Sequence, residues 1–234
     1  MIKFDEQART LHVNVNDLVH SAELFDEEMQ ASGPTRGHLG SKIHSEYFNA
    51  QDPVAYRKEV FVRWEGEWRG FAVTVEGRAD GVVTTADGVI VEEIKSTLRH
   101  GRLMESMVLA SPHSEQCALY CLLLRLAGTP VDGGVVKYIS ATDRVMRIFD
   151  IQFDAGTSTE LLHRRLDEII REQQLEAHQR SRRETHAQAM RFPFDTIRPG
   201  QQLMMDEIEG AARDGRIILC AAPTGIGKTA AALF

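Results

Sequence analysis

Between residues 57 and 95 the side chains follow a two-residue period, and no other feature limits the possible folds as strongly. Val60, Val62 and Trp64 alternate with polar residues, which is the pattern of a strand with one buried face. Further along, an Asp-Gly turn at 86–88 separates two runs of β-branched residues, an arrangement typical of a β-hairpin. We therefore expect three antiparallel strands, at about 57–64, 69–85 and 88–95.

Segments with the period of an α-helix flank these strands. Apolar residues recur there at intervals of three and four positions, which predicts amphipathic helices. We expect helices at 15–31, 37–50, 103–128 and 156–188, and two further strands at 134–140 and 145–153. Pro112 suggests that the third helix begins or restarts near that residue. Strands and helices that alternate in this way predict an α/β fold in which helices flank a mixed central sheet.

The composition is that of a folded globular protein. Of 234 residues, 43% are hydrophobic and 26% are charged, and no apolar run is long enough to cross a bilayer. The segment Met1 to Thr10 is polar and lacks the apolar stretch of a secretory signal, so we expect a cytoplasmic protein without a membrane partner. A net charge of −7 argues against DNA binding by bulk electrostatics, although a bound metal and a few local cations can offset carboxylates at a site.

Three cysteines are present, which is an odd number for a framework of disulfides. Cys117 and Cys121 lie in an apolar, helix-like run, and Cys220 stands far from both. Three thiolates also fall short of the four that ligate an iron–sulfur cluster. We expect all three cysteines to be buried as small apolar side chains, and we expect no iron–sulfur cluster in this chain.

Acidic residues interrupt the apolar pattern of the hairpin. Asp80 lies in its second strand region, and Glu93 and Lys95 end the third. Glu93 and Lys95 share a face because side chains alternate along a strand, and pairing around the turn brings Asp80 close to Glu93. Two adjacent carboxylates repel each other unless a cation lies between them. Oxygen ligands favour Mg²⁺ or Mn²⁺, so these residues predict a site for one of these ions.

Such a site suits phosphodiester hydrolysis, in which a metal polarises a phosphoryl oxygen and activates water. Lys95 could orient that water or stabilise the developing charge, and the backbone carbonyl of Ile94 could be a further ligand. Glu59, on the first strand, is a candidate third acid, whereas Glu92 points to the opposite face and is excluded. The alternative is a surface hairpin with incidental charges, since acids and lysines at this spacing also arise by chance.

Two helical motifs flank the hairpin. Gly40 to His44 form a G-x-x-x-H pattern before it, and Gln116 to Tyr120 form a Q-x-x-x-Y pattern after it. Positions i and i+4 of a helix share a face, so Gln116 and Tyr120 point the same way. In this order and spacing, the motifs of residues 37–155 resemble those of RecB-type nucleases of the PD-(D/E)xK superfamily, including the RecB-like CRISPR-associated exonucleases.

The resemblance implies a restriction-endonuclease-like core in a nuclease domain over residues 1–190. Its activity would be cleavage of single-stranded or free-ended DNA, in repair or defence. The resemblance also implies roles for six side chains, namely metal binding by His44, Asp80 and Glu93, catalysis by the two acids with Lys95, and DNA positioning by Gln116 and Tyr120. Ala79 stands where such nucleases often have a proline, and the cluster cysteines of several of them are absent.

The C-terminal segment carries a second functional pattern, which is typical of nucleotide binding. We expect a helix at 199–213, a strand at 216–221 and then a P-loop, A-P-T-G-I-G-K-T, at 222–229. In a P-loop, backbone N–H groups wrap phosphates, the lysine reaches the β- and γ-phosphates and the last threonine binds Mg²⁺. Arg198 to Gln201 are similar to the helicase Q-motif, whose glutamine reads adenine. We expect the nucleotide to contact Gln201, Thr224, Gly225, Gly227, Lys228 and Thr229.

Residues 192–234 resemble the start of DinG/XPD-type superfamily 2 DNA helicases. We expect 191–234 to be the truncated opening of a helicase motor, with ATP and the remainder of that motor belonging to a longer protein. This chain alone is expected not to hydrolyse ATP efficiently, because a P-loop by itself does not position water. Two alternatives stay open. A non-catalytic DNA-binding module that loads a helicase would bind DNA without cleaving it, and a motor in its own right would show DNA-stimulated ATPase activity.

Overall fold

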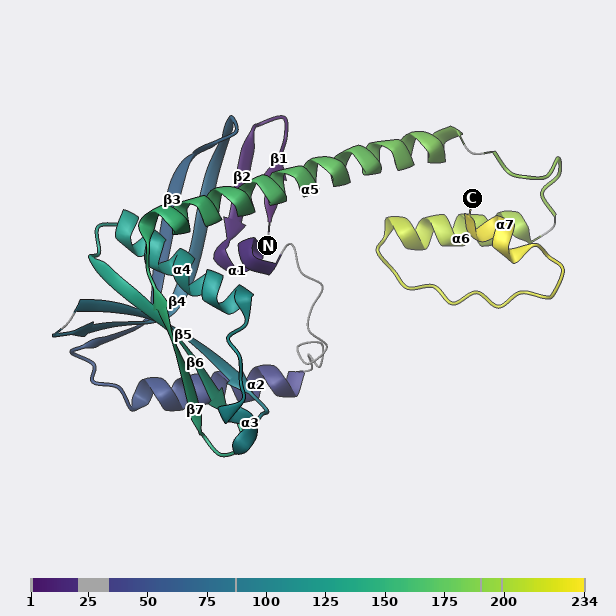
Figure 1. The fold of residues 1–234 in the computed structure, drawn as a ribbon. Helices are drawn as coiled ribbons and strands as arrows, with labels where there is room; N and C mark the ends of the chain where they lie inside the picture. The colour runs from purple at the N-terminus through teal and green to yellow at the C-terminus, as the bar shows by residue number, and fades with distance from the viewer. Residues whose placement is uncertain (1, 21–33, 87, 190, 199, 234) are drawn as a thin grey trace. The chain divides into compact units, whose positions relative to one another are not determined.

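The computed structural model describes residues 2–20, 34–86, 88–189, 191–198 and 200–233 (Figure 1). The chain separates into two compact units, Met1–Gln174 and Leu175–Phe234. This division lies inside a long helix and before residue 190, where the sequence predicts the boundary between domains. Within the described part of the chain, no helix combines the length and the apolar character that crossing a bilayer needs.

Among the described residues, the first unit contains one sheet of seven strands. They are β1 (Lys3–Asp5), β2 (Thr10–Asn14), β3 (Tyr56–Trp68), β4 (Phe71–Thr85), β5 (Gly88–Thr97), β6 (Val131–Ser140) and β7 (Met146–Gln152). The order across the sheet is β1-β2-β4-β5-β6-β7, with β3 paired to β4. The β2–β4 and β5–β6 pairs are parallel and the other pairs are antiparallel. The predicted mixed central sheet is therefore confirmed.

The strands that the sequence predicts correspond to β3 through β7. β1 and β2 were not predicted, because β1 is only Lys3–Asp5 and β2 has only two buried apolar positions, Leu11 and Val13. Two alternations are too few to indicate a strand without knowledge of its partner. The partner of β2 is the N-terminal half of β4, about sixty residues later in the chain.

Five helices of the described chain begin in the first unit. They are α1 (Val15–His20), α2 (Pro34–Asn49), α3 (Arg102–Glu105), α4 (Ser111–Leu126) and α5 (Ala155–Ala189). The predicted helix at 15–31 is described only over α1, and its remainder lies outside the described residues. The helix predicted at 103–128 is divided into α3 and α4, and the second begins beside Pro112, where the sequence indicates that the helix begins or restarts. Pro112 lies in the first turn of α4, where a proline is tolerated, but it would break a helix that ran through it.

α4 and α2 lie on opposite faces of the sheet (Figure 1). Lys95 of β5 contacts Gln116 of α4, whereas Glu92 of β5 contacts Tyr47 of α2. Residues an odd number of positions apart in a strand point to opposite faces, so these two contacts assign one helix to each face. β5 therefore carries charged side chains toward both helices.

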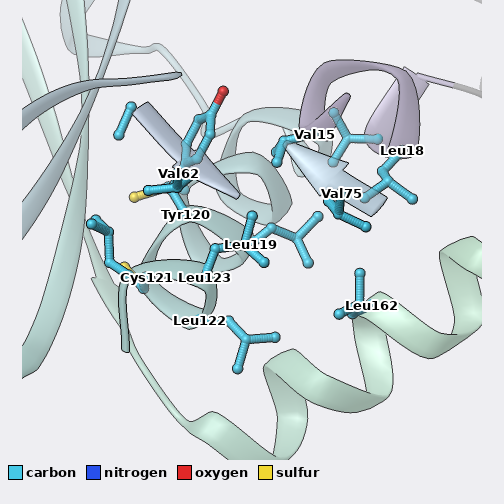
Figure 2. Packing of buried hydrophobic residues seen from close by; sticks show 14 of the residues in the cluster. Val15, Leu18, Val62, Val75, Leu119, Tyr120, Cys121, Leu122, Leu123 and Leu162 are labelled. Atoms are coloured by element: carbon cyan, nitrogen blue, oxygen red, sulfur yellow. The ribbon is translucent and has the colours of Figure 1, made fainter. Parts of the chain in front are cut away.

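The main core lies between α4 and the sheet. Figure 2 shows Leu119 and Leu122 of α4 packed near Leu18 of α1 and Leu162 of α5. Each of these side chains is at most 2% exposed, and burying a leucine contributes roughly 1.5–3 kcal/mol. This packing holds α4 firmly against the strands that carry the acidic residues.

Two glycines let α4 approach the sheet closely. A Cβ at Gly77 of β4 would lie 2.8 Å from a ring carbon of Tyr120, and one at Gly134 of β6 would lie 2.5 Å from Cys117 Sγ. Any larger residue at these positions would push α4 outward. Cys117 and Cys121, both residues of α4, are buried as predicted, with their sulfur atoms against Gly134 of β6.

The second unit contains α6 (Gln201–Arg213) and α7 (Lys228–Leu233) besides the end of α5. The strand predicted at 216–221 is wrong, because these residues form no strand in the described structure. Ile217 and Leu219 are fully exposed, at 103% and 98%. An apolar run becomes a strand only when another strand accepts its backbone hydrogen bonds, and the described second unit offers none. Cys220, predicted to be buried, is exposed for the same reason.

Candidate active site

β4 changes its neighbour along one edge just before Gly81. β2 pairs with this edge from Ala72 to Glu76, and β5 pairs with it from Gly81 to Thr85. In the described sheet, residues 77–80 therefore lack a strand partner on this edge, while β3 pairs along the other edge. The sheet opens at this point, and Asp80 lies in the opening.

The side chain of Asp80 takes the place of a missing strand. β5 leaves β4 after Glu92 and continues beside β6 alone, so the backbone N–H of Ile94 has no carbonyl of β4 to bond. Asp80 Oδ2 accepts this N–H at 2.7 Å. The N–H and C=O of one strand residue point to the same neighbour. The carbonyl of Ile94 is therefore directed toward Asp80, which is the orientation that its predicted role as a ligand needs.

α2 brings His44 to the same opening. His44 Nδ1 lies 3.9 Å from Asp80 Oδ1, and both side chains are partly exposed. Gly40, one helical turn earlier, marks the close approach of α2 to β5, because a Cβ there would lie 3.2 Å from Ser96 Oγ. The glycine of the G-x-x-x-H motif thus allows α2 to approach the sheet closely, and the histidine of the motif reaches Asp80.

Glu93 and Lys95 form an ion pair on the α4 face of β5. Lys95 Nζ lies 2.8 Å from Glu93 Oε1, and the glutamate side chain is only 3% exposed. The other oxygen, Oε2, is buried and has no hydrogen-bond partner among the described residues. Burial raises the pKa of Glu93 to about 7, the Lys95 ammonium opposes this rise, and the Asp80 carboxylate adds to it.

Asp80 is perturbed in the same direction. Burial raises the pKa of its carboxyl, the N–H of Ile94, the His44 ring and the Lys95 ammonium oppose the rise, and the Glu59 carboxylate adds to it. Both carboxyl groups would thus gain from a nearby positive charge.

Gln116 and Tyr120 lie under the site and not on its surface. Gln116 Oε1 accepts a hydrogen bond from Lys95 Nζ at 2.9 Å, and Gln116 Nε2 donates to Asn16 Oδ1 at 2.6 Å. Burial and the Glu93 carboxylate raise the pKa of Tyr120. Both side chains of the Q-x-x-x-Y motif are at most 3% exposed. In this structure Gln116 supports Lys95, and the positioning of DNA by Gln116 and Tyr120 stays a prediction.

A cavity of about 420 Å³ opens on the α2 side of Asp80. It is lined by Ser41, His44, Ser45, Phe48, Asn49, Lys58, Glu59 and Asp80. Glu59 has a φ of 50° within β3, and the strand pairing skips it, since Lys58 pairs with Gly81 and Val60 with Ala79. A residue other than glycine in this left-handed conformation is strained, and such strain is concentrated at functional sites.

The candidate third acid, Glu59, therefore lies at the site. Lys58 lies there too, although nothing in the sequence singled it out except its place beside Glu59. A lysine in a strand is usually a solvated surface residue, and Lys58 is exposed as well as part of the cavity lining.

The acidic residues fit a hard divalent cation by chemical type. Glu93 Oε2 is a buried oxygen without a partner, and buried carboxylates of this kind are stabilised by a metal. As the side chains stand, Glu93 is turned to Lys95 and Asp80 to Ile94. Within the described residues, no three His, Cys, Asp or Glu side chains are grouped closely enough to hold an ion.

In the second unit the P-loop segment contacts Gln201. Gln201 Oε1 accepts the N–H of Arg198 at 2.6 Å, and its Nε2 donates to the Gly227 carbonyl at 3.4 Å. Lys228 Nζ donates to the carbonyls of Ala222 and Pro223, at 2.8 and 3.1 Å. The structure therefore brings the predicted adenine-reading glutamine beside the loop.

The glycines and threonines of this loop differ in backbone conformation and exposure. Gly225 and Gly227 have φ values of 83° and 82°, a left-handed conformation that glycine adopts without strain. Thr224 and Thr229 are exposed. Nucleotide binding by these residues stays a prediction.

No protein-family model and no curated protein matches the sequence. Among solved structures, SSO0001 is 20% identical with a TM-score of 0.49, covering 71% of this chain and 78% of that one. An alkaline exonuclease (LHK-Exo) from Laribacter hongkongensis is 12% identical with a TM-score of 0.41, covering 76% of this chain and 95% of that one.

Proposed function

We propose that this protein is a divalent-metal-dependent DNA nuclease of the PD-(D/E)xK type. More specifically, it would be the nuclease part of a nuclease–helicase in DNA repair or defence. One observation carries the proposal. Two carboxyl groups with raised pKa, the partly exposed Asp80 and the buried Glu93, lie with the Lys95 ammonium where the sheet opens. Structural ion pairs seldom leave a buried carboxylate oxygen unpaired, and among the described residues Glu93 Oε2 has no partner.

The residues that would hold Mg²⁺ or Mn²⁺ are His44, Asp80, Glu93 and the carbonyl of Ile94. When bound, the cation would polarise a phosphoryl oxygen and lower the pKa of a water molecule. His44 supports this assignment because it approaches Asp80 from a separate element, α2, at 3.9 Å. Glu59, which faces the same cavity, supplies additional negative charge.

Lys95 is the residue proposed to act on the attacking water and the developing charge. Its ammonium is held between Glu93 Oε1 at 2.8 Å and Gln116 Oε1 at 2.9 Å. Gln116 is itself held by Asn16. A cation fixed in this way needs no reorganisation during the reaction, which is the condition for effective electrostatic stabilisation.

DNA is the proposed substrate, either single-stranded or with a free end. The protein carries a net charge of −7, so recognition would depend on local groups and not on the overall field. Lys58 in the cavity beside Asp80 is one such group. The Gln201–P-loop contact in the second unit favours a motor segment that would take ATP in a longer protein.

The test is DNA cleavage with Mg²⁺ or Mn²⁺ by wild type, Asp80→Asn and Lys95→Met, on linear and circular substrates of one and two strands. Glu65→Gln is the matched control, because Glu65 is an exposed acid on β3 that pairs with Arg63. We expect both site variants to lose at least about 100-fold in rate and the control to lose none. Equal rates in all four proteins would contradict the assignment. A wild type that binds DNA without cutting it would favour the non-catalytic loading module.

A further inference from the structure

Glu92 precedes the proposed catalytic Glu93 but belongs to a different cluster. On the α2 face of β5 it accepts a hydrogen bond from the Tyr47 hydroxyl at 2.8 Å and forms an ion pair with Lys137 of β6. Lys137 Nζ also donates to the Tyr47 hydroxyl at 2.7 Å. Each member of this Tyr47–Glu92–Lys137 cluster therefore contacts the other two. The charged groups of the cluster are well shielded, at 14% exposure for Lys137 and 6% for Glu92.

Aromatic rings enclose the cluster. The rings of Phe48 and Tyr56 each lie 6.2 Å from that of Tyr47. Burial raises the pKa of Tyr47, and the Glu92 carboxylate raises it further, so the hydroxyl remains a donor at neutral pH. The hydroxyl of Tyr56 covers Gly81, where a Cβ would lie 2.0 Å from it. Tyr56 thus contacts both the ring of Tyr47 and Gly81, the residue that follows Asp80.

A buried ion pair of this kind is a weak source of stability, because desolvation offsets the attraction of the charges. Its best-supported effect is to specify one geometry among several. The apolar contact of α2 with the sheet is small and rests on Ile43, Ile94 and Ile139. Apolar contacts are not directional, so they do not determine how far α2 is rotated or shifted along the sheet. The hydrogen bonds of Tyr47 are directional and add such a constraint, as does the exposed ion pair of Glu46 with Arg144.

The position of Tyr47 determines that of His44. The two residues are three positions apart on α2, so they share one face of the helix. At the other end of the same network, Glu92 is two positions from Ile94, whose N–H binds Asp80. The cluster therefore ties the helix that carries the histidine to the strand that orients the aspartate.

We propose that Tyr47, Glu92 and Lys137 are positioning residues that hold α2 so that His44 and Asp80 can bind one divalent cation together. This inference rests on the proposed function, because metal binding by His44 is part of it. Groups that orient metal ligands typically change metal affinity by 10- to 100-fold when they are removed. None of the three residues would touch the cation or the DNA.

The test is a double-mutant cycle of Tyr47→Phe with His44→Ala in the full chain, read as Mn²⁺ affinity by titration calorimetry. We expect Tyr47→Phe to weaken Mn²⁺ binding about tenfold in the wild type and to have no further effect in the His44→Ala background. Tyr138→Phe is the matched control. It removes a buried tyrosine hydroxyl from the residue next to Lys137, one that bonds Ala110 and His113 instead, and it should leave Mn²⁺ affinity unchanged.

Unchanged affinity in Tyr47→Phe, or an equal loss in both backgrounds, would overturn the proposal. Glu92→Gln provides a second route if Tyr47→Phe does not fold, since it keeps an acceptor for Tyr47 but removes the charge that holds Lys137. It should weaken Mn²⁺ binding only when His44 is present. Failure of the proposed function is read from the wild type alone, as absence of both Mn²⁺ binding and cleavage. A wild type that binds and cuts, with variants that bind equally well, contradicts only the positioning role.

Discussion

Replacing Glu93 with glutamine should change how the stability of the metal-free protein depends on pH. The side chain is 3% exposed, and burial raises the pKa of the carboxyl to about 7, from about 4.3 in an unfolded chain. Between these two values the folded protein keeps a proton that the unfolded chain has lost. The free energy of unfolding therefore falls as the pH rises through this window, and the loss is complete above the folded-state pKa.

The size of this effect follows from the shift. Each pKa unit corresponds to about 1.4 kcal/mol, so the full penalty on the wild type is about 4 kcal/mol above pH 7. Part of it is already present at pH 5. Glutamine has the same shape but does not titrate. The stability of Glu93→Gln relative to wild type should therefore increase by about 2.5 kcal/mol between pH 5 and pH 8. Any fixed effect of the altered contact with Lys95 cancels in this difference.

The assay is urea unfolding at fixed pH with EDTA, followed by tryptophan fluorescence. Both tryptophans, Trp64 and Trp68, lie on β3 in the first unit, so the fluorescence reports on the unit that contains the site. Glu65→Gln is the control, because the Glu65 side chain is 63% exposed and its replacement should give no such pH dependence. A difference between Glu93→Gln and wild type that stays constant or shrinks toward pH 8 would refute the reasoning.

Two further outcomes are expected. Gly81→Ala should lower the free energy of unfolding by about 1–3 kcal/mol and reduce cleavage, since its Cβ would lie 2.0 Å from the Tyr56 hydroxyl. Gly133→Ala is the control, because its Cβ would lie no closer than 3.4 Å to another atom. It should lower the free energy of unfolding, measured by chemical denaturation, by less than Gly81→Ala does. Lys58→Ala should weaken DNA binding without metal and reduce the slope of log affinity against log salt by about 0.7–0.9. Anisotropy titrations at several salt concentrations measure this slope, and an unchanged slope would exclude a phosphate contact by Lys58.

Much of the fold could be predicted because its patterns are local. The β4–β5 hairpin follows from alternation on both sides of an Asp-Gly turn, and α4 from apolar residues at helical spacing. Asp80, Glu93 and Lys95 could be predicted as neighbours for the same reason, since pairing around one short turn determines which residues face each other.

Other features could not be predicted because they depend on distant segments. β2 pairs with β4 across about sixty residues, and this pairing, together with the departure of β5, opens the sheet at Asp80. The apolar run at 216–221 shows the converse, since a good local pattern without a partner strand stays unpaired. Ile217 is exposed there, although an apolar strand position is normally buried.

Glu92 shows most clearly where the two sources of information differ. Alternation along β5 correctly predicts that Glu92 faces away from Glu93, because the direction of a side chain is set by the backbone of its own strand. What lies on that other face is decided by the docking of α2, which brings Tyr47 from 45 residues away in the chain. By itself, the sequence determined the strands, the helices and the types of chemical group that they carry. Only the tertiary structure decided which groups meet, because contacts between distant segments form through packing and pairing that no local pattern contains.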